Sequence, residues 1–480
     1  MNILLVEFYM MVVSLISILV ISQKNINNTI LNGIMFLSAI ITSWLLFENR
    51  VINELSIYIW NFNLKVDMLT LSIKLLIIFF LLNYIYLSKN YFNYENLYIK
   101  EFLIVIWILF LGSFFLLMSN EFFILFLSLE LQNLILYFLT NLRRNRSLTI
   151  EASLKYFLLG SFSSAILLYG IIMLFGILGT LDFVEISYLL KDLYFVEMEI
   201  NVILFFFFFI IIGFLFKLGV APFHWWVPEV YVGAPVLITL LFSYLPKLTL
   251  IFIFFKLYIY IFFFFNYILN LFFFFFVFFS LIVGFLFSFY QKTIIKFLAY
   301  SSIFNGGFFL AAFSNGTFFS FLSLFYFFLP YLFILLGIFF FLIAIRKLNN
   351  EKFKLLWDLS ILGNTNKYLG IILSVFFFSL AGIPPLAGFF GKFFLLMSLI
   401  LNKFFILFFI VMFFSVISSF YYFRVVRFIF FSNIMEYTFL KYNLNIYFLI
   451  FYLFLNVYFF FFFDSIFFFF FYLFNLNFFI

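Results

Sequence analysis

Four ionisable residues lie deep inside long apolar segments of this sequence: Glu130, Lys217, Lys247 and Lys392. A charged side chain near the centre of a bilayer costs about 2.5–3.5 kcal/mol on insertion scales, so four together approach about 10 kcal/mol. That sum is comparable to the net stability of a whole domain. Ionisable residues inside membrane segments mark ion pathways and proton relays. The sequence therefore predicts a buried path for protons.

Glu130 is central in the apolar stretch "EFFILFLSLELQNLILYFL", and an unpaired carboxylate there would take up a proton. Lys217 carries the opposite sign and lies just before a break in its own apolar segment. At about 7 Å and an effective dielectric constant of about 20, the two charges attract by roughly 2.4 kcal/mol. Each would keep the other charged, and separation of the pair would release a proton. The alternative is a structural ion pair that joins two helices.

Lys247 directly follows Pro246 in the next apolar segment. A proline inside a helix removes one backbone hydrogen bond, and here it frees the carbonyl group of Phe242. We expect this carbonyl group to attract water beside the ammonium group of Lys247. The alternative is that Lys247 extends along its apolar stem to the membrane surface.

Lys392 follows the double proline Pro384–Pro385. The carbonyl groups of Leu380 and Ala381 lose their helical partners at this break. Irregular backbone at membrane depth is tolerated only inside protein or beside a wet cavity. We therefore expect buried lysines and internal water to coincide, with extension of Lys392 to the surface as the alternative.

His224, the only histidine, is a further candidate site residue because it follows the break after Lys217. A lone histidine is either a hydrogen-bonded packing residue or a proton carrier, and both readings stay open. The sequence has no cysteine, which excludes thiolate ligands, iron–sulfur clusters and disulfides on this chain. One histidine is too few for a haem or copper site. Any redox centre that this protein serves must therefore lie on other chains.

The composition shows which solvent surrounds these residues. Of 480 residues, 68% are hydrophobic and only 9% are charged, whereas soluble domains carry about a quarter of charged residues. About 20 apolar residues span a bilayer, so we predict an all-α polytopic membrane protein. About fourteen transmembrane helices are expected, at residues 3–22, 29–47, 69–88, 101–119, 121–141, 156–179, 201–231, 235–260, 267–289, 295–314, 317–345, 368–400, 403–427 and 444–463. The apolar tail 465–480 is an interfacial segment or a continuation of the last helix.

The basic residues predict the orientation. If the N-terminus is outside, connections after odd-numbered helices lie inside and should hold Lys and Arg. Of 26 basic residues, 17 fall on that side, 6 on the outer side (Lys74 and Lys256 among them) and 3 within helices. The outer connection 180–200 is acidic. The net charge of +7 is thus a property of the inner surface and implies no nucleic-acid partner. Inner positions are expected for Arg143, Arg144, Arg146, Lys292, Lys296, Arg346, Lys347, Lys352, Lys354, Lys367, Arg424 and Arg427.

Two of the predicted helices, 201–231 and 368–400, are interrupted by glycine and proline and lie five helices apart. Broken helices at matching places in two halves indicate an inverted repeat whose breaks line the transport site. We predict an N-terminal three-helix block, two antiporter-like repeats of five helices each, and a C-terminal helix with its tail. Their expected bounds are 1–100, 101–262, 263–430 and 431–480.

Four motifs resemble a known family. They are "KYFLLGSFSSAILLYGI" (155–171), "FKLGVAPFHWWVPEVYVGAPVLIT" (216–239), "KFLAYSSI" (296–303) and "SLAGIPPLAGFFGKF" (379–393). They resemble NADH dehydrogenase subunit 2, the smallest of the antiporter-like membrane subunits of respiratory complex I. The similarity spans about 150–395. Many relatives have a histidine after "AYSSI", where this chain has Asn305, which holds a water but cannot change charge.

The resemblance implies a proton-translocating subunit of NADH:ubiquinone oxidoreductase, with other membrane-arm subunits, lipid, protons and internal water as its partners. By motif, the family's pumping residues fall on Glu130, Lys217, Lys247 and Lys392. NADH, FMN, the iron–sulfur clusters and ubiquinone would be bound by partner subunits. The resemblance also implies a mitochondrial inner membrane protein, and the abundance of Phe, Ile, Tyr, Asn and Lys, whose codons are rich in A and T, indicates an organellar genome.

Two other functions remain open at this point. One is a subunit of a cation/proton antiporter of the related multisubunit type, which subunit composition would distinguish. The other is a structural membrane scaffold whose buried charges only pair helices. A scaffold would keep proton pumping intact when Lys217 and Lys247 are replaced.

Overall fold

The computed structural model describes residues 4–22, 28–52, 57–95, 100–143, 146–193, 197–347, 352–432, 440–442 and 447–462, together with 464, 468 and 471. Arg144, for which an inner position is expected, is not among the described residues, and neither is most of the tail 465–480. The described chain is almost entirely helical, as the apolar composition predicts, because a backbone in lipid must satisfy its own hydrogen bonds.

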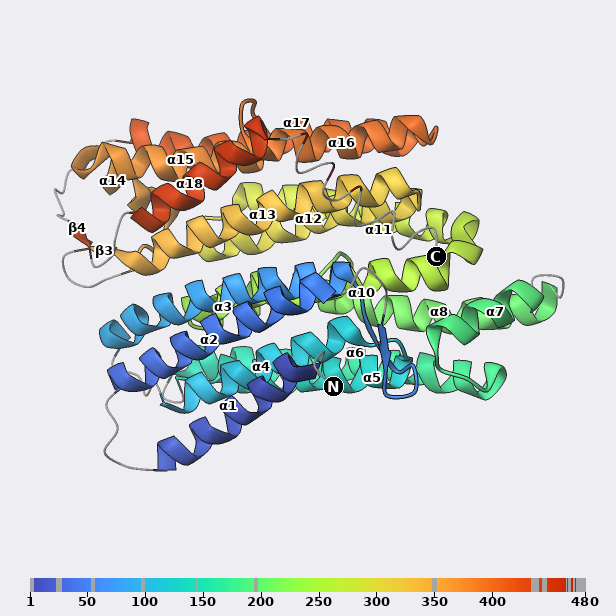
Figure 1. Cartoon of the computed structure of the whole chain (residues 1–480). Helices are drawn as coiled ribbons and strands as arrows, with labels where there is room; N and C mark the ends of the chain where they lie inside the picture. Colours follow the sequence, from blue (N-terminus) through green and yellow to red (C-terminus); the bar gives the residue numbers. More distant parts are fainter. Residues whose placement is uncertain are drawn as a thin grey trace. The chain divides into compact units, whose positions relative to one another are not determined.

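The chain forms two compact units. Unit 1 contains Met1–Lys217 and Leu245–Phe264, and unit 2 contains Leu218–Tyr244 and Phe265–Ile480. Within each unit, most of the long helices run nearly parallel or antiparallel to one another (Figure 1). These units group residues by packing and not by repeat, so the predicted repeats 101–262 and 263–430 stay a prediction.

Unit 1 holds the N-terminal helices and a hairpin. Its elements are α1 (Leu5–Ser22), α2 (Asn28–Ile52), β1 (Ile57–Ile59), β2 (Leu64–Val66), α3 (Met68–Glu95), α4 (Lys100–Met118), α5 (Phe122–Thr140), α6 (Ser147–Leu178), α7 (Phe183–Leu193), α8 (Glu197–Leu218) and the larger part of α10 (Val236–Tyr260), followed by the 3-10 helix η2 (Phe262–Phe265).

Unit 2 is built around one fully buried helix. Its elements are α9 (Trp226–Gly233), the first residues of α10, α11 (Asn266–Tyr290), α12 (Ile294–Asn315), α13 (Phe318–Ala344), β3 (Ile345–Lys347), the 3-10 helix η3 (Leu356–Leu359), α14 (Ser360–Thr365), α15 (Lys367–Ala381), α16 (Ala387–Leu401), α17 (Phe405–Phe431), β4 (Leu440–Tyr442) and α18 (Tyr447–Phe461). Every residue of α13 from Ser320 to Ala344 is buried. The helix packs against α12, α15, α16 and α18, and so forms the core of the unit.

The predicted membrane fold is confirmed. Ten helices of the described chain are long and apolar enough to cross a membrane. Four further crossings come from α1, α2, the broken pair α15–α16, and α18, which are shorter and also apolar. These ten and four make the expected fourteen. The five crossings from α4 to α10 and the five from α11 to α17 are each interrupted at the fourth crossing. Because five is an odd number, the second set of five begins on the opposite side of the membrane from the first.

The helix bounds agree with the sequence within a few residues except where polar residues extend a helix. The start of α6 is Ser147, nine residues before the predicted start at 156. Its first turns are polar and carry an ion pair between Glu151 and Lys155 at 2.6 Å. Hydropathy predicts only the part of a helix that lies inside lipid. Polar helical turns that extend beyond the membrane are therefore not predicted by it.

A hairpin and a short helix lie at the predicted outer end of unit 1, and neither was predicted. β1 and β2 pair antiparallel with Ile57 opposite Val66. The turn between them holds Trp60, Asn61 and Phe62 at positive φ, a conformation in which large side chains are rare. α7 occupies the connection that the sequence analysis described only as acidic.

Candidate functional site

The break after α8 places Lys217 at a helix end. α8 stops at Leu218, and Gly219 follows with φ of +72°, a left-handed conformation that favours glycine. A side chain at Gly219 would also overlap Val227 in the first turn of α9. Lys217 therefore lies in the last helical turn, where the unpaired carbonyl groups carry partial negative charge and favour a cation.

Glu130 of α5 and Lys217 of α8 form the predicted pair within unit 1. Lys217 Nζ lies 3.5 Å from Glu130 Oε1, and the two side chains are 7% and 24% exposed. The separation is half the roughly 7 Å assumed from sequence, and longer than the 2.7–2.9 Å usual for a charge-assisted hydrogen bond. Asn133 Nδ2 donates to the same carboxylate oxygen at 3.2 Å. The predicted pair is therefore formed, as an ion pair that is longer than a direct hydrogen bond.

Lys392 lies in α16 beside the second break and is 7% exposed. Its Nζ donates to the carbonyl oxygens of Leu380 at 2.8 Å and Ala381 at 2.9 Å, the two groups that the sequence identified as losing their helical partners. The ammonium group thus binds directly to carbonyl groups at which we expected water. The ring of Phe308 in α12 lies 5.6 Å away. Gly382, with φ of +86°, ends α15 and lets the backbone approach Lys392.

Lys247 is inside unit 1 and is 6% exposed. α10 continues through Pro246, and Thr249 donates its hydroxyl group to the carbonyl oxygens of Leu245 and Pro246. The low exposure of Lys247 and of Lys392 contradicts the alternative that either extends to the membrane surface. Both ammonium groups are held inside protein.

His224 lies in the break between α8 and α9 and belongs to unit 2. Its Nδ1 is 3.2 Å from the carbonyl oxygen of Pro222 and its ring stacks on Trp225, with only 8% of the residue exposed. A carbonyl oxygen only accepts, so Nδ1 carries the proton. These contacts favour the packing reading, and a proton-carrying role stays a prediction. Asn305 is 2% exposed, and its Nδ2 donor has no acceptor in the described chain, which suits a bound water.

Three of the lysines that the sequence predicts on the outer side of the membrane, Lys65, Lys74 and Lys256, are buried in protein. Lys74 is 1% exposed in α3 and forms an ion pair with Glu7 of α1. Lys256 is 5% exposed in α10, and its Nζ donates to the carbonyl oxygen of Ser119 at 2.5 Å. Lys74 and Lys256 both lie near the ends of predicted helices, and their burial by neighbouring helices could not be predicted from hydropathy. The burial of Lys74 could have been suspected from the sequence, because Glu7 is an acidic residue in the first apolar segment and offers it a partner of opposite charge.

The family comparison covers the elements that carry these charges. Residues 119–418 match the family described as "NADH:quinone oxidoreductase/Mrp antiporter, TM", which is more than half of the chain. The chain belongs to this family. The matched range contains both helix breaks and Glu130, Lys217, Lys247 and Lys392.

Relatives in the NADH:quinone oxidoreductase/Mrp antiporter family cover most of the chain. The "NADH-ubiquinone oxidoreductase chain 2" of Marchantia polymorpha is 32% identical over 77% of this chain and 75% of its own length. The protein of the same name from Oenothera berteroana is 31% identical over 83% of this chain and 80% of its own. The "NADH-quinone oxidoreductase subunit N" of Pelagibacter ubique is 30% identical over 86% of each.

Solved structures of low sequence identity share the fold. A chain of respiratory complex I from Thermus thermophilus has a TM-score of 0.75 at 22% identity, over 95% of this chain and 96% of that one. A chain of an archaeal membrane-bound sulfane sulfur reductase reaches 0.81 at 18% identity, over 98% and 96%. A chain of the Mrp complex from Dietzia gives 0.73 at 16% identity, over 89% and 80%. These likenesses concern the fold alone.

Proposed function

We propose that this chain is a proton-translocating membrane subunit of NADH:ubiquinone oxidoreductase, respiratory complex I, and that protons pass through Glu130, Lys217, Lys247 and Lys392. The family and the 30–32% identical relatives named as oxidoreductase chains support the membership. The geometry of the buried charges supports the relay itself.

The observation that carries the proposal is the ion pair between Glu130 and Lys217. Its two charges lie in membrane-spanning helices at the first break, 3.5 Å apart. With an effective dielectric constant of about 20, their attraction is about 5 kcal/mol, and about 2 kcal/mol if they move to about 7 Å. A movement of this size changes how tightly the ammonium group holds its proton. The pair therefore serves as a switch that the rest of the complex drives.

Lys392 supplies the corresponding cation at the second break. Its charged form is stabilised by the carbonyl groups of Leu380 and Ala381. A change in the geometry of the break would weaken both bonds and favour release of the proton. Lys247, buried in α10 between the two breaks in sequence, is the carrier that we place between Lys217 and Lys392. His224 is a further candidate at the first break.

The redox chemistry belongs, in this proposal, to partner subunits that bind NADH, FMN, iron–sulfur clusters and ubiquinone. The lack of cysteine in the chain supports this assignment. Other membrane-arm subunits are the expected partners, and the mitochondrial inner membrane is the expected location. The two plant relatives named as NADH-ubiquinone oxidoreductase chains and the codon bias support that location.

A subunit of a cation/proton antiporter is the second candidate, because the family description includes the Mrp antiporter. Purification of the native complex and identification of the chains that comigrate distinguishes the two. Copurification with flavin and iron–sulfur subunits, and NADH-driven pumping that falls in Glu130→Gln, supports the proposal. Cation-dependent proton exchange without NADH oxidase partners would overturn it in favour of the antiporter.

A further inference from the structure

The predicted outer end of unit 1 is closed by three chain segments. The hairpin 57–66, the connection 119–121 and the connection 180–183 are joined by backbone hydrogen bonds. Asn120 N donates to Asn63 O at 2.9 Å, and Phe183 N donates to Asn120 O at 3.0 Å. Asn120 is thus fixed at the meeting point of all three segments, directly after the end of α4.

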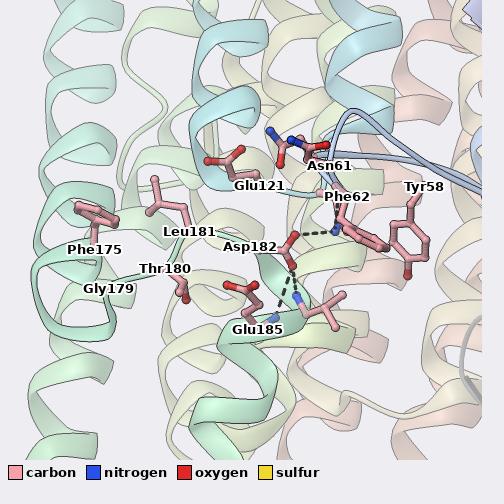
Figure 2. Close-up of a pocket in the computed structure, with 13 residues that line it drawn as sticks. Tyr58, Asn61, Phe62, Glu121, Phe175, Gly179, Thr180, Leu181, Asp182 and Glu185 are labelled. Carbon is pink, nitrogen blue, oxygen red and sulfur yellow. Dashed lines mark hydrogen bonds between the residues drawn. The ribbon is translucent and has the colours of Figure 1, made fainter.

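A cavity of about 510 Å³ opens beside these segments and is lined by three carboxylates, Glu121, Asp182 and Glu185 (Figure 2). Glu185 is exposed and the other two are half-buried, so water reaches the cavity. Asp182 Oδ1 accepts from the backbone N–H of Val184 at 2.7 Å, at the start of α7. The cavity is therefore acidic and open to water.

Asn120 lines the cavity and is completely buried. Its Nδ2 donates to Asp182 Oδ2 at 3.2 Å and to Phe62 O at 3.1 Å. Its Oδ1 has no hydrogen-bond donor in the described chain, which is the condition under which a buried water is held. A metal is not indicated, because the described residues contain no group of three or more His, Cys, Asp or Glu placed to bind one.

Lys256 contacts the residue that precedes Asn120. Its ammonium group donates to the carbonyl oxygen of Ser119, the neighbouring residue, and interacts electrostatically with Asp67, Lys65 and Asp182. Lys65 forms an ion pair with Asp67 at 3.1 Å and donates to the hydroxyl group of Tyr260 at 2.9 Å. Lys256 shares Asp67 with Lys65, and Asp182 is the second carboxylate whose charge acts on Lys256.

Lys256 does not belong to the central relay. It follows Lys247 by nine residues of α10, which is about 13.5 Å along the axis and half a turn around it. Two ammonium groups so placed cannot exchange a proton directly. Lys256 therefore serves the surface end of unit 1, and the proposed relay leaves its burial unexplained.

We propose that this outer end of unit 1 is a proton port, in which Lys256 exchanges protons with the outer aqueous phase through water at Asn120 and the carboxylates Asp182 and Glu121. A proton leaves the ammonium group of Lys256 and binds Asp182, which leaves a neutral amine and a carboxylic acid. Asp182 then gives the proton to water in the cavity and regains its charge. The port rests on the proposed function for the source of its protons.

The carboxyl group of Glu121 supports this assignment. Its burial and the nearby charge of Asp182 raise the pKa of Glu121 above that of an ordinary glutamate. A carboxyl group that holds its proton at higher pH exchanges it more effectively near neutral pH. The competing explanation is structural: Lys256 would only satisfy the carbonyl group at the end of α4, where a cation is favoured.

The test measures NADH-driven turnover and proton release of the assembled complex in oriented proteoliposomes, with the outer pH varied at constant inner pH. The wild type should respond to the outer pH. Lys256→Gln and the double variant Glu121→Gln with Asp182→Asn should lose this response and slow release by about 100-fold, the lower end of the effect of a positioned acid–base group. These variants keep side chains of similar shape, and the amount of assembled complex is measured in each.

Two further variants separate the explanations. Lys256→Arg keeps the charge and the bond to Ser119 but does not give up its proton, so the port predicts the same loss as Lys256→Gln. Wild-type behaviour of Lys256→Arg would establish the structural role and overturn the port. Glu151→Gln, an exposed carboxylate of α6 in an ion pair with Lys155, is the matched control and should leave the outer-pH response unchanged.

Glu130→Gln in the same liposomes separates failure of the port from failure of the proposed function. If Glu130→Gln abolishes pumping while the Lys256 and Asp182 variants keep the outer-pH response, only the port is wrong. If Glu130→Gln pumps normally, the relay is wrong. Loss of the outer-pH response in the port variants supports the port in either case.

Discussion

Replacement of Glu130 by Gln removes the only carboxylate paired with Lys217 among the described residues and keeps the shape of the side chain. At 3.5 Å and an effective dielectric constant of about 20, the pair attracts by about 5 kcal/mol. Because Glu130 keeps 24% exposure, water screens part of this, and about 5 kcal/mol is an upper value. At 1.4 kcal/mol for each factor of ten, loss of this attraction weakens proton binding by Lys217 by up to about 3.5 powers of ten. The variant therefore removes the ion pair that we propose as the switch at the first break.

The assay is the ratio of protons translocated to quinone reduced by the assembled complex in sealed vesicles, with NADH as the donor. We expect Glu130→Gln to lower proton pumping strongly while the complex still assembles, since Gln fills the same space and still accepts a hydrogen bond from Asn133. Glu130→Asp, which keeps the charge on a shorter side chain, should retain part of the pumping.

The matched control is Glu151→Gln on the neighbouring helix α6. Its ion pair with Lys155 is shorter, at 2.6 Å, but the side chains are 59% and 41% exposed, and exposed pairs contribute about 0–1 kcal/mol. We expect it to pump as the wild type does. Unchanged pumping and turnover in assembled Glu130→Gln would refute the reasoning, because a buried charge could then be removed without consequence.

Three further predictions follow from other parts of the chain. Lys392→Met leaves two buried carbonyl groups without a hydrogen-bond donor, which costs about 1–3 kcal/mol each. The complex with Lys392→Met should therefore unfold at a lower temperature than the complex with Lys392→Gln. Equal unfolding temperatures would contradict the role of the hydrogen bonds. The raised pKa of Glu121 means that its contribution to stability is full at acidic pH and is lost as the pH rises through the folded-state pKa. Glu121→Gln should therefore unfold at a higher temperature than the wild type at neutral pH, and a difference that persists below the ordinary glutamate pKa would contradict this cause. Cysteines placed at the exposed positions Arg146 and Lys354 should react with impermeant reagents only from the predicted inner side of the membrane, and labelling from the other face would overturn the orientation.

The helices and their breaks were predictable because each follows from local chemistry. An apolar run of sufficient length has no alternative to a helix in lipid, and the glycine and proline residues of both breaks are visible in the sequence. The freed carbonyl groups of Leu380 and Ala381 could be named in advance because a proline removes specific hydrogen bonds. That the ammonium group of Lys392 would be their hydrogen-bond donor could not be predicted, because it depends on the path of the chain after the break.

The outer end of unit 1 could not be predicted because it depends on contacts between distant segments. The hairpin has an unusual turn with Trp60, Asn61 and Phe62 at positive φ, for which the sequence offers no glycine. Asn120 joins segments more than 50 residues apart, and the bond from Lys256 to Ser119 spans 137 residues. Hydropathy gives the side of the membrane near which Lys256 lies, but not the contacts with distant segments that bury it.

The most direct test of the central claim, that protons pass through the buried lysines, is the proton-to-quinone ratio of the assembled complex carrying Lys247→Arg. Arginine keeps the positive charge at this buried position but does not release its proton at physiological pH. If Lys247 carries protons, Lys247→Arg should pump nearly as poorly as Lys247→Ala, with comparable amounts of assembled complex. Full pumping by Lys247→Arg would show that only a fixed charge is needed at this position and would contradict the relay.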